Sequence, residues 1–227
     1  MISVGTQWNP KQALLKSLLE KNGRFDEAIQ LCLDMHSMVH SQEVGNGEDR
    51  TLDDELWEGL DEKTFRSMIK GGTTIAWNIW HLARIEDITA NILIADGIQA
   101  INSENWPEKM NVRIRDTGNA MTGDEIMAFS SDINMKELRN YRTCVGRKTQ
   151  EIIKKLKPEE LKRKPSHEML RRILDEGGVL EAEDSRWLID FWGRKTVAGI
   201  LLMPITRHQI VHLNDSFKIK QKSKSTK

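Results

Sequence analysis

One apolar stretch, TIAWNIWHLARIEDITANILIAD, constrains the fold more than any other part of the chain. Its large apolar residues recur every three or four positions, which is the period of a helix with a buried face. Thr73 or Thr74 can cap the start of this helix, and Gly97 can close its end. A long buried helix is therefore predicted over residues 73–96, with His81 on its inward stripe.

Three other segments have the same helical period, and no segment alternates long enough to predict a strand. Together with the first, the long helices are predicted at residues 25–41, 73–96, 134–156 and 195–217. Pro204 lies inside the last one, where it must kink the helix or mark its start. Because the connections on either side of 134–156 are long, we predict an all-α fold, a four-helix bundle with crossover connections.

The chain has 227 residues, enough for one domain with a sizeable core, and we assign residues 1–217 to it. Lys plus Arg and Asp plus Glu number 34 each, so no chain-wide charge favours nucleic acid. Residues 218–227, KIKQKSKSTK, hold five lysines and no acid, which predicts a disordered basic tail.

The cysteine count and the absence of membrane and signal patterns in the sequence bear on where the protein is located. Only Cys32 and Cys144 are cysteines, too few for a secreted disulfide scaffold of this length. No run of 18 apolar residues predicts a membrane span, and the N-terminus has no signal-peptide pattern. A cytoplasmic location without a membrane or nucleic-acid partner is expected. The seven Trp residues could fill a helical core or anchor a ligand pocket.

Two of the histidine pairs have the spacing HxxxH, namely His36 with His40 and His208 with His212. Residues four apart lie on one face of a helix, so two such imidazoles can converge on one metal ion. His208 and His212 follow inward-facing apolar residues, and His81 also faces inward on another helix. We therefore predict a site in which His81, His208 and His212 hold one divalent metal.

Several alternatives remain open at this point. A single inward histidine is more often a hydrogen-bonded core residue than a ligand. Cys32, His36 and His40 share one helix face and could form a metal site of their own. They could instead be polar residues at a helix end beside a solvent-exposed loop. In a third alternative, His40 lies at the first metal as a ligand or base. Side chains near the predicted ligands could orient them or could make ordinary ion pairs: Glu86, Asp87, Asn214 and Asp215.

The segments WNIWHLARIED and RHQIVHLND together resemble the DinB-like superfamily, which includes YfiT-type proteins and mycothiol-dependent maleylpyruvate isomerases. The pattern is a histidine followed five residues later by an acidic residue, and an HxxxH pair about 125 residues further on. DMHSMVHS and TLDDELWEGL also resemble one branch of that family. The resemblance covers residues 25–217.

The resemblance implies a four-helix bundle of DinB type and a metal, usually zinc or nickel, held by His81, His208 and His212. It also implies a homodimer and, as in some members, a low-molecular-weight thiol as co-substrate. The connection at residues 157–193 is longer than in the shortest members, so it can reshape the mouth of the site and the substrate cannot be carried over.

Three functions are consistent with these residues. The first is a metal-dependent enzyme, a thiol-dependent S-transferase or a hydrolase of a small molecule, with His40 or Glu86 as the base. The second is a non-enzymatic stress-response protein with a structural metal. The third is a helical interaction module in which the histidines are core residues. An exchangeable water on the metal would distinguish the first from the second.

Overall fold

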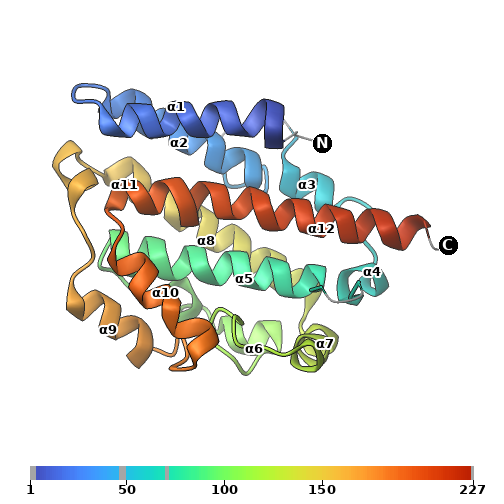
Figure 1. The fold of residues 1–227 in the computed structure, drawn as a ribbon. Helices are drawn as coiled ribbons and strands as arrows, with labels where there is room; N and C mark the ends of the chain where they lie inside the picture. Colours follow the sequence, from blue (N-terminus) through green and yellow to red (C-terminus); the bar gives the residue numbers. More distant parts are fainter. Residues whose placement is uncertain (1–3, 46–49, 70–71, 226–227) are drawn as a thin grey trace.

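The computed structural model describes residues 4–45, 50–69 and 72–225 of the chain (Figure 1). All regular structure in these ranges is helical, which confirms the predicted all-α class. The longer elements are α1 (Asn9–Glu20), α2 (Phe25–Val39), α5 (Ile75–Asp87), its π-helical continuation η2 (Ile88–Ile94), α8 (Met135–Lys155) and α12 (His208–Ser225). The shorter elements are η1 (Val4–Trp8), α3 (Leu52–Trp57), α4 (Glu62–Arg66), η3 (Ala100–Asn102), α6 (Trp106–Met110), α7 (Gly123–Asp132), η4 (Pro158–Lys162), α9 (His167–Asp175), α10 (Glu183–Gly193), α11 (Val197–Ile200) and η5 (Leu201–Arg207).

Two of the predicted long helices, α5 and α8, begin at side chains that accept hydrogen bonds from free backbone N–H groups. Thr74 caps α5 by accepting from Trp77 N, and Asn134 caps α8 by accepting from Glu137 N. The helix predicted at 25–41 ends at Val39, because His40 already has an extended backbone. The N-terminal helix α1, which includes Pro10 in its first turn, packs on α2.

The helix predicted at 195–217 contains a widened turn around Pro204. Proline has no N–H to donate and its ring clashes one turn back, so an α-helix cannot pass through it undisturbed. The segment η5 is π-helical instead, and its Thr206 Oγ1 donates to Leu201 O at 2.9 Å. α12 follows directly and begins at His208.

The structure differs from the prediction of a disordered basic tail from residue 218. α12 continues to Ser225, and residues 226 and 227 lie outside the described part. Lys220 Nζ donates to the backbone carbonyls of Glu55, Leu56 and Glu58 at 2.7–2.9 Å, around the end of α3. An ammonium group at the carbonyl end of a helix is favourable, so this lysine holds the segment against the domain.

α5 lies at the centre of the molecule, and each of its residues is buried. α8 and α12 pack against it, and α2 packs on both of these helices (Figure 1). Each large apolar side chain buried in this way contributes about 1.5–3 kcal/mol. The largest fully buried side chains include Trp8, Trp80 and Trp192, so several tryptophans fill the core.

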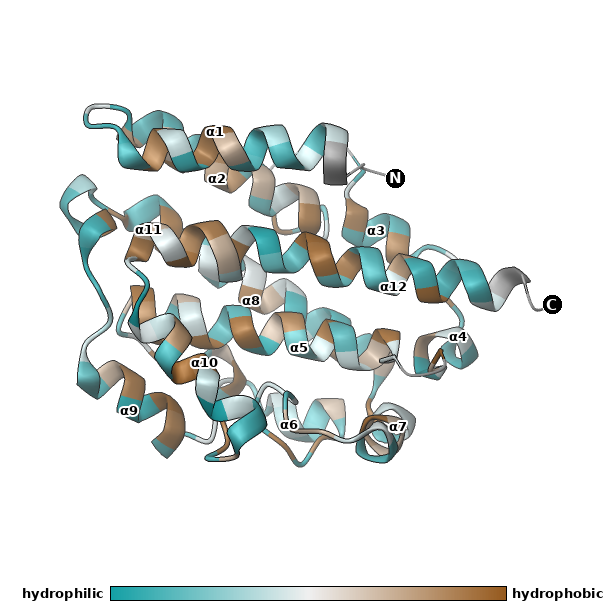
Figure 2. Cartoon of the chain, in the orientation of Figure 1, coloured by the Kyte–Doolittle hydropathy of each residue, from teal (hydrophilic) through white to brown (hydrophobic). Residues whose placement is uncertain are grey.

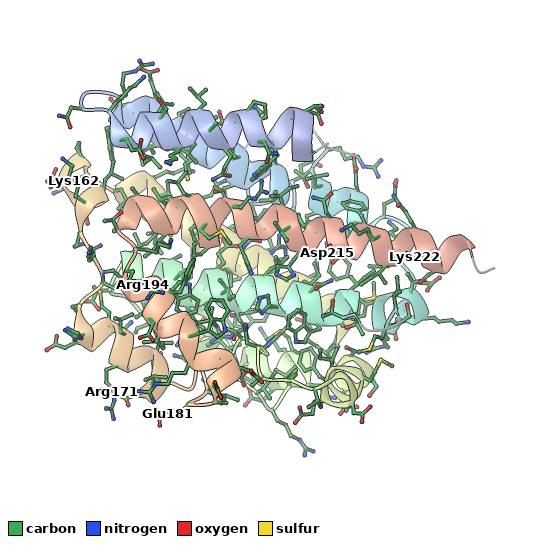
Figure 3. The ribbon with its side chains drawn as sticks, in the orientation of Figure 1. Lys162, Arg171, Glu181, Arg194, Asp215 and Lys222 are labelled. Atoms are coloured by element: carbon green, nitrogen blue, oxygen red, sulfur yellow. The ribbon has the colours of Figure 1, made fainter. Side chains whose placement is uncertain are left out.

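The periphery of the molecule is polar. Figure 2 shows hydrophilic colour on the turn between α1 and α2 and on the segment that leads from η4 to α9. Figure 3 places Lys162, Arg171 and Glu181 at the outer edge of the 157–193 connection.

In the described ranges, none of the helices combines the length and apolarity needed to cross a membrane.

Candidate metal centre

His81, His208 and His212 come together at the contact between α5 and α12. One ligand nitrogen from each lies within 4.8 Å of the others. The ring centroids are 5.0 Å apart for His81 and His208, 4.8 Å for His81 and His212, and 4.6 Å for His208 and His212. The three rings thus form a nearly regular triangle, which we call the open cluster.

The spacing of the nitrogens fits a metal ion. Two imidazoles bound at about 2.0–2.1 Å to a tetrahedral ion have their nitrogens about 3.3 Å apart. The Nε2 atoms of His81 and His208 lie 3.1 Å apart. The donor set of three imidazoles suits zinc, nickel, copper or ferrous iron better than magnesium or calcium.

The tautomers of two of these histidines are set by acceptors behind them. His81 Nδ1 lies 2.8 Å from Thr117 O, and a carbonyl can only accept, so Nδ1 carries the proton. His212 Nδ1 lies 3.4 Å from Asn78 Oδ1, which also accepts from Thr73 Oγ1. In both rings the Nε2 lone pair is left for a metal, as in metal sites whose ligands are oriented from behind.

A strip of backbone, residues 115–118, runs along α5 and accepts from its side chains. Arg84 Nε donates to Arg115 O, Trp80 Nε1 to Asp116 O, and Trp77 Nε1 to Gly118 O. The Thr117 carbonyl between them accepts from His81. This strip fixes the His81 ring, which also stacks on Trp77 with centroids 4.5 Å apart.

The three imidazoles are neutral near pH 7, as ligands must be. Burial, with the nearby His212, lowers the pKa of His81 to about 3, against the opposing bond to Thr117. Burial and the neighbouring histidines hold the pKa of His208 well below its ordinary value. Burial also lowers the pKa of His212.

A pocket of about 410 Å³ opens onto the cluster. Residues of α5, η5, α12 and α10 line it, and α10 belongs to the 157–193 connection. The lining includes no Asp, Glu, Lys or Arg and comprises Trp77, His81, Ile85, Asn119, Trp187, Leu188, Phe191, Trp192, Met203, Pro204, His208 and His212. Tryptophan therefore serves both as core and as pocket wall in this protein.

A second group of metal-ligating side chains lies between α2 and α5. His36 Nε2 is 2.7 Å from Glu86 Oε1, and His40 Nε2 is 2.9 Å from Glu86 Oε2. The two imidazoles stack with their centroids 4.1 Å apart. The side chains of His36, His40 and Glu86 are fully buried, and we call them the sealed cluster.

The charges in the sealed cluster are coupled. Burial alone would raise the pKa of Glu86, but the imidazoles of His40 and His36 outweigh it and hold that pKa well below its ordinary value. Burial lowers the pKa of His40 to about 3, against the opposing Glu86 charge. Glu86 is thus the acidic member of a fully buried group in which both imidazoles contact one carboxylate.

The structure places the two predicted bases, His40 and Glu86, in the sealed cluster, and neither lines the pocket. The reason is helix geometry: Glu86 follows His81 by five residues and so points about 140° away around α5. Cys32 shares a helix with His36 but is not part of either cluster, and His167 is exposed. Burial raises the pKa of the Cys32 thiol to about 12.

Asp87, Asn214 and Asp215 were also candidates for orienting the ligands, but the hydrogen bonds they make are with other residues than the three histidines. Asp87 accepts from Arg84, Tyr141 and the backbone N–H groups of Ala100 and Ile101. Asn214 donates to a carbonyl of its own helix, and Asp215 pairs with Lys218. These residues stabilise the helices.

The residues that orient the open cluster, Thr117 and Asn78, were missed by sequence reasoning. Asn78 lies one turn before His81 on the same helix, a spacing that could have suggested it. Thr117 acts through its backbone carbonyl, for which the sequence holds no signal.

Comparisons with known proteins bear on the segment that carries these sites. No curated protein matches the chain. The family model described as the DinB superfamily matches residues 48–215. The match includes the open cluster and Glu86, and it begins after His36 and His40. The resemblance inferred from the two histidine motifs is thus confirmed, and the chain belongs to the DinB superfamily.

Proposed function

We propose that this protein is a metal-dependent enzyme whose open cluster binds one divalent ion, with zinc and nickel as the preferred candidates. The observation that carries the proposal is the combination of three converging imidazoles with a pocket directly beside them. A structural metal site is closed by protein ligands, whereas a catalytic site has three protein ligands and an open position. An ion in such a site supplies a Lewis acid that binds a thiolate or lowers the pKa of water.

The lining of the pocket indicates the kind of substrate. Because no charged side chain lines it, a neutral molecule with an apolar or aromatic part would fit better than a highly charged one. Trp77, Trp187 and Phe191 offer flat faces against which such a molecule can pack. Displacement of water by these walls would strengthen polar contacts within the pocket.

Asn119 is the polar lining residue besides the three histidines. Its Oδ1 accepts from Thr117 Oγ1 at 2.8 Å, so its orientation is set and Nδ2 is left as a donor. We assign to Nδ2 the role of donating to a substrate oxygen. Thr117 thereby supports the site twice, through its carbonyl on His81 and through its hydroxyl on Asn119.

The proposed reaction is attack of a small thiol, or of water, on an electrophilic carbon. In the thiol case, a sulfur–carbon bond forms, the bond to the leaving group breaks with its electron pair, and the thiol proton ends on the leaving group. With water, an oxygen–carbon bond forms and one water proton ends on the leaving group. The lining offers no carboxylate as a base.

The arrangement of α2, α5, α8 and α12 supports a finer proposal for the fold. These four helices contact one another around the two clusters, and long connections join α5 to α8 and α8 to α12. We assign them to a four-helix bundle of DinB type with crossover connections.

Thiol binding to cobalt-substituted protein tests the function. Thiophenol added to the wild type should give a sulfur-to-cobalt charge-transfer band, which His208→Ala should abolish. His167→Ala is the matched control, because it removes an exposed histidine outside the clusters. A band of equal strength in His208→Ala, or none in the wild type with cobalt or nickel, would overturn the proposal.

Turnover tests the reaction class in the same samples. Chlorodinitrobenzene with a thiol reports S-transfer, and nitrophenyl acetate reports hydrolysis. The expected result is metal-dependent turnover of at least one probe that His81→Ala reduces at least 100-fold, since the ion would be lost. Turnover that is unchanged by His81→Ala would exclude the open cluster as the active site.

A further inference from the structure

The sealed cluster has the chemistry of a second metal site. We propose that His36, His40 and Glu86 bind a divalent transition-metal ion, separate from the ion of the open cluster, and that this ion fastens α2 to α5. The proposal does not depend on the function assigned to the open cluster. The family match begins after His36 and His40, so it does not account for them.

The donor atoms already face one another. The Nε2 atoms of His36 and His40 each approach a different oxygen of one carboxylate, at 2.7 and 2.9 Å. One ligand atom from each residue lies within 4.8 Å of the others. Two imidazole nitrogens and a two-oxygen carboxylate around one point form a set that zinc and ferrous iron accept.

The buried charge of Glu86 calls for a cation. The ion pairs that Glu86 makes within the described ranges are with His36 and His40. Two buried guanidinium groups nearby on α5 and α8 have other partners: Arg84 pairs with Asp87, and Arg142 pairs with Asp53. A fully buried carboxylate without a fixed cation is unfavourable, and a metal ion would supply that charge.

Several polar atoms of the cluster have no hydrogen bond among the described residues. His40 Nε2 and Glu86 Oε2 are close, yet their geometry is not that of a hydrogen bond. The Nδ1 atoms of His36 and His40 are also without a partner. Unsatisfied buried polar atoms are rare in proteins, and a bound ion that takes up the Nε2 and Oε2 lone pairs explains two of the four.

The neighbouring helix leaves room for His40. Gly146 lies within α8, and a Cβ atom there would stand 2.7 Å from His40 Nδ1. Arg142, one turn earlier on α8, donates to Val39 O and so fixes the end of α2 beside His40. The ring is thus held by a close approach of α8 and by a bond to the residue before it.

The two proposed ions would lie at different positions along the axis of α5. His81 and Glu86 both lie on α5, and five residues correspond to about 7.5 Å along a helix axis. They also point to different sides of it. The second ion would join the α1–α2 pair, which lies before the start of the family match, to the central helix.

Metal stoichiometry tests the proposal. Untagged full-length protein is stripped with a chelator and reloaded anaerobically with zinc, cobalt or ferrous iron, and metal per chain is measured by mass spectrometry. We expect two ions in the wild type and in His167→Ala, one in Glu86→Gln, and one in His208→Ala. Glu86→Gln should retain the thiophenol band of the open cluster.

A second measurement covers the case in which Glu86→Gln does not fold. X-ray absorption of cobalt in His208→Ala should report two imidazoles and carboxylate oxygens. His208→Ala without cobalt, or wild type with one ion that Glu86→Gln retains, would overturn the second site. Wild type with one ion that Glu86→Gln loses and His208→Ala retains would support the second site while refuting the proposed function.

Discussion

The open and sealed clusters contain the same HxxxH spacing and differ in what surrounds it. In the open cluster, the pair on α12 meets a third imidazole and a pocket. In the sealed cluster, the pair at the end of α2 meets a carboxylate in the interior. The spacing brings two nitrogens together in both places, while the opposing helix decides whether the group faces a ligand or fastens two helices.

The largest expected difference between the clusters is the rate of metal loss. An ion in the open cluster can pass to a chelator through the pocket, whereas release from the sealed cluster needs a local opening of α2 from α5. If that opening costs about 3 kcal/mol, release is more than 100-fold slower. Stopped-flow mixing of doubly loaded protein with a coloured chelator should give two phases, and a single phase would remove this distinction.

The second comparison concerns stability without metal. Glu86→Gln should lower the free energy of unfolding by about 3 kcal/mol, because it breaks a fully buried pair. His212→Gln should lower it by less than about 1 kcal/mol, because His212 is partly exposed. Urea denaturation of both chelated variants at pH 7 provides the measurement. Equal losses would show that both clusters serve the fold.

A smaller effect is expected where α8 meets the sealed cluster. Gly146→Ala places a methyl group against the His40 ring and should destabilise the protein by about 1–2 kcal/mol, even though alanine favours a helix. Gly123→Ala at the start of α7 is the control, since its added Cβ meets nothing within 4 Å. If Gly146→Ala were as stable as Gly123→Ala, the packing around His40 would be loose.

The smallest stability change is expected at the mouth of the open cluster. Trp187 is 50% exposed, so Trp187→Ala should alter the free energy of unfolding by less than about 0.5 kcal/mol. The same change removes an aromatic wall of the pocket and should weaken thiophenol binding to the cobalt protein three- to tenfold. Exposed Leu14 on α1 supplies the control, Leu14→Ala, which should leave thiophenol binding unchanged.

The sequence was sufficient to predict the parts that depend on local periodicity. The apolar run around His81 predicted α5, and the spacing of His208 and His212 predicted that they share a face. The role of Glu86 could not be predicted in this way, because it depends on which helix lies 140° around α5 from His81. The continuation of α12 beyond residue 217 could not be predicted for a related reason. It depends on Lys220, which donates to backbone carbonyls of residues that are distant in the sequence.

The widened segment η5 bears on how the chain tolerates insertions and deletions. A π-helical turn holds one residue more than an α-helical turn. Loss of one residue between Leu201 and Arg207 would therefore twist α12 by about 100° relative to α11. Either His208 and His212 would leave His81, or the buried residues of α11 would leave the core. We therefore expect the length of η5 to be more strongly conserved among homologues than its amino-acid composition.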